Sequence, residues 1–167
     1  MRQIRVKLIY FMALQVINLF PEVIKMFIGE YSHSLDAKGR LIVPAKFREE
    51  LGEHFIMTKG IDKCLYIYPR SEWEIFENKL RELPLANANA RRFTRFFLSG
   101  AVECDTDNQG RIIIPQSLRN HAGLTKEVVS AGVGTKIEVW SKDNWEAECN
   151  PDNLDDSIVE SMGLFGI

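Results

Sequence analysis

Short apolar segments separated by turn residues dominate the first half of the chain. Residues 31–35 alternate between apolar and polar side chains, which is the two-residue period of a β-strand. Residues 41–43 form a short apolar run, and residues 54–58 and 64–68 flank another turn. The pattern therefore predicts strands at each of these places.

A short helical period follows the first apolar run. Phe47 and Leu51 lie four positions apart after Pro44, which predicts a helix of about two turns that begins at the proline in its first position. Gly52 is the predicted end of this helix, because glycine favours the backbone conformation that follows a helix.

Two longer helices are predicted between residues 71 and 99. Ser71 and Glu74 have the spacing of a capping box, which marks the start of the first helix, and Pro84 breaks it. The apolar positions of the two helices are Trp73, Ile75, Phe76 and Leu80, and then Phe93, Phe96, Phe97 and Leu98. Aromatic residues at helical spacing are more typical of a core or a subunit contact than of a base-stacking platform.

The same order of elements returns in the second half. The predicted elements are a strand through 102–104, a strand through 112–114, a short helix from Pro115 to Gly123, strands near 128–129 and 136–140 around a turn at 132–134, and a final helix capped by Ser141. Residues 27–77 thus match residues 98–149. A period of about 70 is too long for a solenoid and predicts a duplication with a pseudo-two-fold axis.

The best-preserved part of the duplication is a charged turn. Asp36-Ala37-Lys38-Gly39-Arg40 returns as Asp107-Asn108-Gln109-Gly110-Arg111, and a further arginine follows eight positions later in both copies. An aspartate accepts hydrogen bonds from the amides of its own turn, and a glycine supplies a positive φ. We therefore expect Asp36, Gly39, Asp107 and Gly110 to form the turns. The first turn is expected to close a hairpin between 31–35 and 41–43.

Two interpretations of the charged side chains in these turns stay open at this point. The first is structural: the aspartate pairs with the arginine of a solvated turn, which contributes about 0–1 kcal/mol. The second is functional: the candidate nucleic-acid contacts are Lys38, Arg40, Gln109 and Arg111. The arginine fork suits phosphate oxygens and the O6/N7 edge of guanine.

Composition and charge favour a protein without a blanket attraction to nucleic acid. The chain has 167 residues, of which 46% are hydrophobic, and a net charge of -2. Residues 1–25 carry +3 and residues 143–167 carry -7, so the part that holds both turns is mildly basic. Three cysteines without a CxxC pair predict a reduced chain with small buried thiols.

The two ends differ from the duplicated part. Residues 1–25 combine a basic start with an apolar run, which imitates a signal peptide, but no small-x-small cleavage site follows Phe20. The run is also shorter than the roughly 20 residues of a membrane span. We expect a misassigned start, with translation from Met26; a membrane-associated extension and a signal peptide are the alternatives. Residues 150–167 form an acidic stretch without clear periodicity, which predicts a mobile tail.

The sequence does not assemble a catalytic constellation. His33, His54 and His121 are scattered and have no partners at metal-ligand spacing. The glycines at 132 and 134 precede a predicted strand rather than a helix, so they do not form a phosphate cradle. We expect neither catalysis nor a cofactor, a metal or a small-molecule substrate.

The residues from Met26 to Tyr31, followed by His33, Leu35-Asp36, Lys38 to Leu41, Pro44 and Lys46 to Arg48, resemble the opening of the MraZ family of bacterial regulators. The resemblance extends to about Trp145 and includes both Asp-x-x-x-Arg turns. It implies an α+β chain: an AbrB-like swapped-hairpin, double-split β-barrel built from two pseudo-symmetric repeats with helices outside. The expected division is an extension at 1–25, a first repeat plus helix at 26–86, a linking helix plus second repeat at 87–149 and a tail at 150–167.

The resemblance also implies a function. In that family the two turns are the DNA-reading loops, which gives Asp36 and Arg40, and Asp107 and Arg111, with Lys38 also matching. Gln109 takes the place of a lysine in the second turn and is expected to bind phosphate more weakly. The implied protein is cytoplasmic and nucleoid-associated, forms ring-shaped homo-oligomers and binds direct repeats in the promoter of the division and cell-wall gene cluster.

Two function classes follow. One is a sequence-specific transcriptional regulator that binds double-stranded promoter DNA, and the other is an oligomeric cytosolic scaffold that uses the same turns for protein contacts. A closed homo-oligomer is expected because apolar helix faces require cover, namely those with Trp73, Phe76, Phe93 and Phe97. A steep dependence of binding on salt distinguishes the two classes, because only DNA binding releases counterions in this way.

Overall fold

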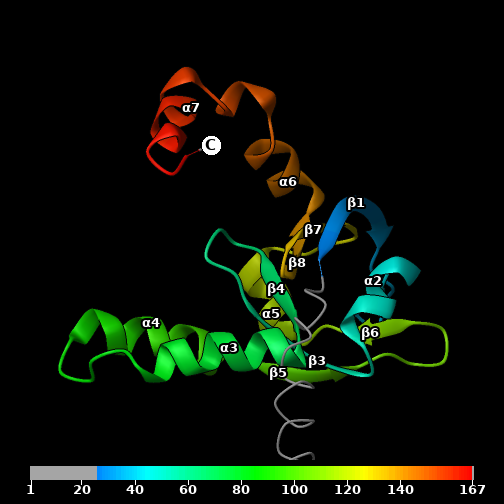
Figure 1. The fold of residues 1–167 in the computed structure, drawn as a ribbon. Coiled ribbons are helices and arrows are strands. Elements are labelled where there is room, and N and C mark those ends of the chain that lie inside the picture. The colour runs from blue at the N-terminus through cyan, green and yellow to red at the C-terminus, as the bar shows by residue number, and fades with distance from the viewer. Residues whose placement is uncertain (1–25, 167) are drawn as a thin grey trace, which may run out of the picture.

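The computed structural model describes residues 26–166 (Figure 1). The expectations for residues 1–25 concern a segment outside the described residues. The first half contains β1 (Phe27–Ser34), β2 (Arg40–Ile42), α2 (Ala45–Leu51), β3 (His54–Lys59), β4 (Leu65–Pro69), α3 (Arg70–Arg81) and α4 (Ala88–Leu98). The second contains β5 (Val102–Asp105), β6 (Arg111–Ile113), α5 (Gln116–Ala122), β7 (Glu127–Gly134), β8 (Lys136–Ser141) and α6 (Lys142–Glu148).

The strand order confirms an α+β fold built from two repeats. One sheet has the order β1-β7-β8-β4-β3-β5, and β2 and β6 form a second, two-stranded sheet. The first strand of each repeat pairs with the third strand of the other, and the two fourth strands pair at the centre of the sheet. If the two repeats are exchanged and the sheet is read from its other edge, the strand order is unchanged, as a pseudo-two-fold axis requires.

The expected local hairpin between 31–35 and 41–43 is wrong. β1 pairs antiparallel with β7 along its whole length, from Phe27 opposite Gly134 to Ser34 opposite Glu127, while β2 pairs with β6. The turn is tight, since the Gly39 amide donates to the Asp36 carbonyl at 2.9 Å, but the strands on its two sides enter different sheets. A lone hairpin buries too little apolar surface to be stable, and exchange between repeats lets both strands contribute to a common core.

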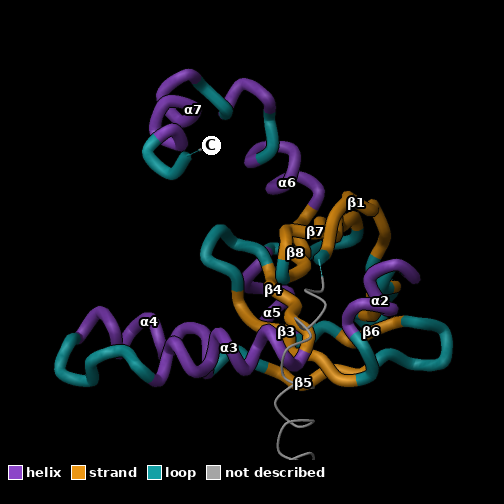
Figure 2. Tube along the Cα trace, viewed as in Figure 1, coloured by secondary structure: helices purple, strands orange, loops and turns teal. Residues whose placement is uncertain are grey.

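Apolar residues cover both faces of the large sheet. On β3, Phe55 and Met57 enter the core beneath β2, β6, α2 and α5, whereas Ile56 faces a second core under α3 and α4. The same alternation on β4 separates Leu65 from Tyr66. Burial on both faces explains why these strands have near-continuous apolar sequences. The strands lie together between the helical parts of the chain (Figure 2).

The helices α3 and α4 lie where the sequence predicts them, but the predicted cap of α3 does not form. α3 begins at Arg70 after Pro69, without a side-chain cap, so the capping box of Ser71 and Glu74 is absent. Glu74 instead accepts a hydrogen bond from Arg70 Nε at 3.2 Å. α4 is capped by Asn87, whose side chain accepts from the amides of the second and third residues of the helix.

Most of the apolar face of α3 and α4 is buried within the chain itself. Trp73 and Phe97 are buried in the second core, and Phe76 packs against it. Only Phe93 of the four residues on which the oligomer prediction relied is exposed, at 44%. The expectation that Trp73 and Phe97 need cover from another copy is therefore wrong, because the chain itself buries both side chains.

Three smaller corrections concern the short helices and the C-terminal part. Pro44 and Pro115 are the caps of α2 and α5 rather than their first residues. β7 continues through the expected turn at 132–134 and ends at Gly134. The tail contains a 3₁₀ turn at Pro151–Asn153 and the exposed helix α7 (Asp156–Gly163), which lies away from both sheets (Figure 1). None of the helices that the structure describes is long and apolar enough to cross a membrane.

Candidate functional site

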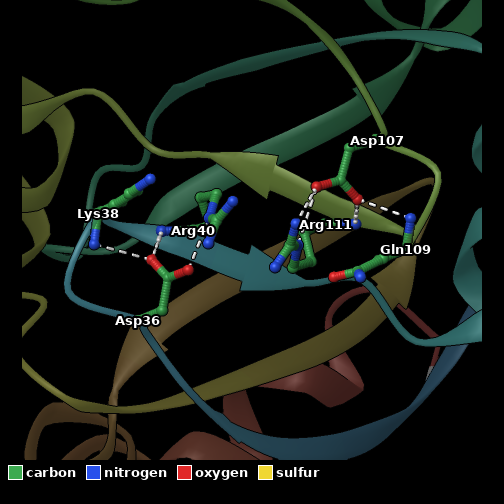
Figure 3. Close-up of polar contacts among 6 residues, drawn as sticks. All are labelled: Asp36, Lys38, Arg40, Asp107, Gln109 and Arg111. Carbon is green, nitrogen blue, oxygen red and sulfur yellow. Dashed lines mark hydrogen bonds and ion pairs between the residues drawn. The ribbon is translucent and has the colours of Figure 1, made fainter.

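The two charged turns meet on the two-stranded sheet of β2 and β6, which we call the ribbon. We call residues 36–40 the first arginine turn and residues 107–111 the second. In the ribbon Arg40 lies opposite Ile113, and Ile42 lies opposite Arg111. Figure 3 shows the two arginines approaching each other from opposite ends of this sheet. Residues 71 positions apart in the sequence thus form one site.

In each turn the aspartate holds the backbone and the arginine together. Asp36 Oδ1 accepts from the amides of Lys38 and Arg40, both at 2.9 Å, and Asp36 Oδ2 accepts from Arg40 Nε at 2.6 Å. The second turn repeats this arrangement (Figure 3): Asp107 Oδ1 accepts from the amides of Gln109 and Arg111 at 2.9 Å, and Asp107 Oδ2 from Arg111 Nε at 2.8 Å. Each aspartate thus accepts hydrogen bonds from two amides of its own turn.

The hydrogen bonds stabilise the charged form of both carboxylates. The backbone amide of Arg111, followed by its side chain, lowers the pKa of Asp107 to about 2. The backbone amide of Arg40 is likewise the largest cause of a lowered pKa at Asp36. Each arginine is therefore held by an ionised partner across the neutral pH range.

The glycines of the turns have the conformation that the sequence predicts. Gly39 has φ 73° and Gly110 has φ 72°, in the left-handed region that disfavours residues with a Cβ. Their carbonyls are also used across the repeats: the Ile114 amide donates to Gly39 at 3.0 Å, and the Val43 amide donates to Gly110 at 2.9 Å. Each turn is thus fixed to the strand of the other repeat.

The outer face of the ribbon carries apolar as well as charged groups. Leu41 and Ile112 point into the core, whereas Ile42 and Ile113 are 48% and 65% exposed beside the arginines. From the sequence both isoleucines are predicted as strand residues only. The signal that identifies them is the alternation along β2 and β6, because the middle residue of each strand is buried and its neighbours must face outward.

Lys38 and Gln109 lie at the tips of the turns and are exposed. Among the described residues, neither side chain takes part in a hydrogen bond or an ion pair within the chain. Both project from the turns that hold the arginines (Figure 3). The four candidate contact residues of the sequence analysis are therefore brought to one surface.

Beside the ribbon is an open depression of about 430 Å³. It is lined by Arg40 and Arg111 together with Asp107, Ile113 and Pro115 and with residues 102–105 of β5. Both arginines therefore border one concave surface.

The remaining candidate chemistry points to structural roles. Within residues 26–166 no group of three or more histidine, cysteine or acidic side chains is arranged to hold a metal ion. Cys64 and Cys104 are buried, and burial raises the pKa of these thiols to about 12 and about 11. The expectation of buried thiols is wrong for Cys149, which is exposed.

The fold and the site define a class of protein: a duplicated α+β chain whose halves exchange strands and join in one arginine-bearing ribbon. Residues 26–96 and 97–156 match the family model described as "MraZ protein, putative antitoxin-like". Proteins named transcriptional regulator MraZ from Alkaliphilus oremlandii, Alkaliphilus metalliredigens and Clostridium tetani are 59%, 57% and 57% identical over 143 residues. These residues make up 85% of this chain and 100% of each relative. The chain belongs to the MraZ family.

Proposed function

We propose that the protein is a transcriptional regulator, without enzymatic activity, that binds double-stranded promoter DNA through the outer face of the ribbon. The observation that carries the proposal is the pair of aspartate-held arginines on one two-stranded sheet. The names of its relatives, which are transcriptional regulators, agree with it.

The shape of the site suits the major groove of DNA. That groove is about 12 Å wide and admits a two-stranded β-ribbon, and its base edges offer hydrogen-bond acceptors and thymine methyl groups. The ribbon presents arginines for the acceptors of guanine or for phosphates, and exposed Ile42 and Ile113 for apolar contact with thymine. Lys38 and Gln109 at the turn tips are placed to contact the DNA backbone.

The aspartates prepare the arginines for this role. Because Arg40 donates its Nε to Asp36 at 2.6 Å, the side chain is oriented before DNA arrives, while its two terminal nitrogens make no hydrogen bond or ion pair among the described residues. In Arg111 the terminal Nη2 also lies 2.8 Å from Asp107 Oδ2. A pre-organised arginine loses less conformational entropy on binding than a free one. The ion pair that looks structural in isolation thus supports the functional interpretation.

We further propose that several copies of the chain assemble into a closed ring in the cytoplasm, associated with the nucleoid. Each copy presents one ribbon to one of the direct repeats in the promoter of the division and cell-wall gene cluster. A single ribbon neutralises few phosphates, so binding to adjacent repeats by linked copies is needed for strong binding.

A titration against the DNA upstream of the protein's own gene tests the proposal. The wild type is expected to bind with an affinity that falls steeply with salt, with a log–log slope of about -0.9 per neutralised phosphate. Arg40→Ala should weaken binding and reduce the slope. The matched control is Arg81→Ala, which removes an exposed arginine whose ion pair with Glu77, at 2.6 Å, has the same i,i+4 spacing. Equal binding by wild type and Arg40→Ala would show that the ribbon is not the DNA surface.

A further inference from the structure

Each turn glycine packs against an arginine of the other repeat. A methyl group added to Gly39 would lie 2.6 Å from Cζ and 2.9 Å from Nε of Arg119, which belongs to α5. A methyl group on Gly110 would lie 2.5 Å from Cζ and 3.0 Å from Nε of Arg48, which belongs to α2. The guanidinium of each arginine therefore packs directly on the glycine of the opposite turn, and a side chain at either glycine would displace it. The contacts are reciprocal and crossed, since the helix of each repeat supports the turn of the other.

The two supporting arginines are half-buried, and each has one buried nitrogen that lacks a partner among the described residues. Within residues 26–166, Nε of Arg48 and Nε of Arg119 are buried without a hydrogen-bond partner. Neither residue takes part in the ion pairs of the described chain, which include both arginines of the ribbon. A buried donor without a partner is unfavourable, and its occurrence at both symmetry-related positions requires an explanation other than local stability.

The backbone shows the same crossed arrangement. Gly39 accepts from the amide of Ile114, and Gly110 accepts from the amide of Val43. Each arginine turn is thus held on its carbonyl side by the opposite strand and on its Cα side by the opposite guanidinium. A repeat on its own would lack both supports, so neither turn is complete without the other half of the chain.

We propose that Arg48 and Arg119 are positioning residues that hold the arginine turn of the opposite repeat in its DNA-binding geometry. Arg48 acts through the second turn and Arg111, and Arg119 acts through the first turn and Arg40. The planar guanidinium covers the face of the glycine and prevents the turn from tilting away from the ribbon. This inference rests on the proposed DNA binding only for its effect on affinity, because the support of the turns exists without DNA.

The first test measures amide hydrogen exchange of the free protein by mass spectrometry. Arg48→Lys keeps the charge but removes the planar group, and it is expected to speed exchange in residues 107–111 while residues 36–40 stay unchanged. Arg119→Lys should give the opposite pattern. The matched controls are Lys46→Ala and Ser117→Ala, which alter equivalent exposed positions of α2 and α5. Faster exchange in the turn of the same repeat, or in neither turn, would overturn the proposal.

The second test is a set of double-mutant cycles for binding to promoter DNA. Arg48→Lys should be coupled to Arg111→Ala and independent of Arg40→Ala, with a coupling of about 3- to 100-fold in affinity as for residues in direct contact. Arg119→Lys should show the crossed pattern with Arg40→Ala. Independence from both ribbon arginines, with a salt slope reduced by about 1 in Arg48→Gln, which removes the charge, would identify Arg48 as a direct phosphate contact and contradict a positioning role.

The two tests separate this inference from the proposed function. If exchange shows the crossed pattern and no variant or wild type binds promoter DNA, the positioning role stands and the DNA-binding proposal fails. If DNA binding depends on Arg40 and Arg111 but exchange and coupling lack the crossed pattern, the DNA-binding proposal stands and the positioning role fails.

Discussion

At the scale of single residues, one carboxylate in each turn binds both the backbone of the turn and the arginine that follows it. Asp107 accepts two backbone amides, which shape the turn, and holds the guanidinium of Arg111. Because the pKa of Asp107 is lowered from 3.8 to about 2, this support is fully present above pH 3.8 and is lost as the pH falls toward 2. The second arginine turn therefore keeps this arrangement throughout the neutral pH range.

The exposed isoleucines of the ribbon give a prediction at the same scale. Ile113→Thr keeps a β-branched residue in the strand, so the free energy of unfolding should change by no more than about 0.5 kcal/mol. Affinity for promoter DNA should fall by about 1 kcal/mol, because the larger apolar arm of the side chain is replaced by a hydroxyl and the apolar contact with a base shrinks. Titration and urea unfolding measure the two quantities. Ile75→Thr, at a position 48% exposed on α3, is the control and should leave both unchanged. An unchanged affinity of Ile113→Thr would place this side chain outside the DNA contact.

A second residue-scale prediction concerns pH. His54 Nδ1 lies 2.5 Å from Asp105 Oδ1 across the β3–β5 pair, and this hydrogen bond raises the pKa of His54 above 6.5. A raised pKa contributes stability that is complete below pH 6.5 and is lost as the pH rises through the folded-state value. His54→Gln should therefore lower Tm more at about pH 5.5 than at about pH 9.

Thermal unfolding at several pH values checks this expectation. Asp105→Asn removes the same pair and should give the same loss at low pH, while the double variant should lose no more than either single one. A loss of Tm that is independent of pH in His54→Gln would mean that the ion pair contributes nothing.

At the scale of elements, the exchange of β1 between the repeats brings its backbone very close to that of β7. Gly132 on β7 lies opposite Gly29, and a methyl group at Gly132 would lie 2.5 Å from the amide nitrogen of Ile28 and the carbonyl carbon of Phe27. The backbones of the exchanged strands approach so closely there that only glycine fits.

Gly132→Ala is therefore expected to lower the free energy of unfolding by about 1–3 kcal/mol or more, as overpacking against a backbone does. Chemical denaturation gives the value. Gly163→Ala is the matched control, because a methyl group at Gly163 meets no atom within 4 Å. If the two variants are equally stable, β1 and β7 do not pair closely in solution.

Sequence patterns predicted the elements better than their partners. Periodicity placed α3 and α4 and the short helices after Pro44 and Pro115, because these depend on local spacing. The predicted hairpin between residues 31–35 and 41–43 is wrong, because the sequence around Gly39 specifies a reversal of direction but not which sheet the next strand joins. The capping-box prediction was wrong at Ser71 because Pro69 already sets the backbone for the start of the helix.

The site was predicted in part for the same reason. The repetition of Asp36 to Arg40 identified both turns, since it is visible along the chain. Ile113 and the contacts of Arg48 and Arg119 were missed, because they depend on the crossing of the repeats. The repetition of an arginine at positions 48 and 119 is visible in the sequence. The glycine that each arginine contacts lies in the other repeat, so the sequence alone does not indicate the contact.

At the scale of the whole molecule, the pseudo-two-fold arrangement concentrates the two arginine turns on one small ribbon, the proposed DNA surface, and leaves other apolar groups exposed. The exposed apolar residues outside the ribbon include Phe93 and Leu85 on or near α4, and Leu164 and Phe165 at the end of α7. These, rather than the buried Trp73 and Phe97, are the apolar groups that a neighbouring copy in the proposed ring would cover.

The proposed ring leads to a prediction about avidity. A DNA fragment with one direct repeat should bind weakly at physiological salt, and fragments with two or three adjacent repeats should gain about 10² to 10⁴ in affinity because the later contacts are effectively intramolecular. Arg40→Ala removes a contact from every engaged copy, so its loss in affinity should grow with the number of repeats. Titrations with fragments of one, two and three repeats measure this growth, while light scattering on the same samples should show the same oligomer for variant and wild type.

Inserting half a helical turn of DNA between repeats is the geometric control, since it rotates the second repeat away from the next ribbon and should remove the gain. An affinity that is equal for one and three repeats, or a monomer at micromolar concentration, would contradict the ring and leave each chain to bind DNA alone.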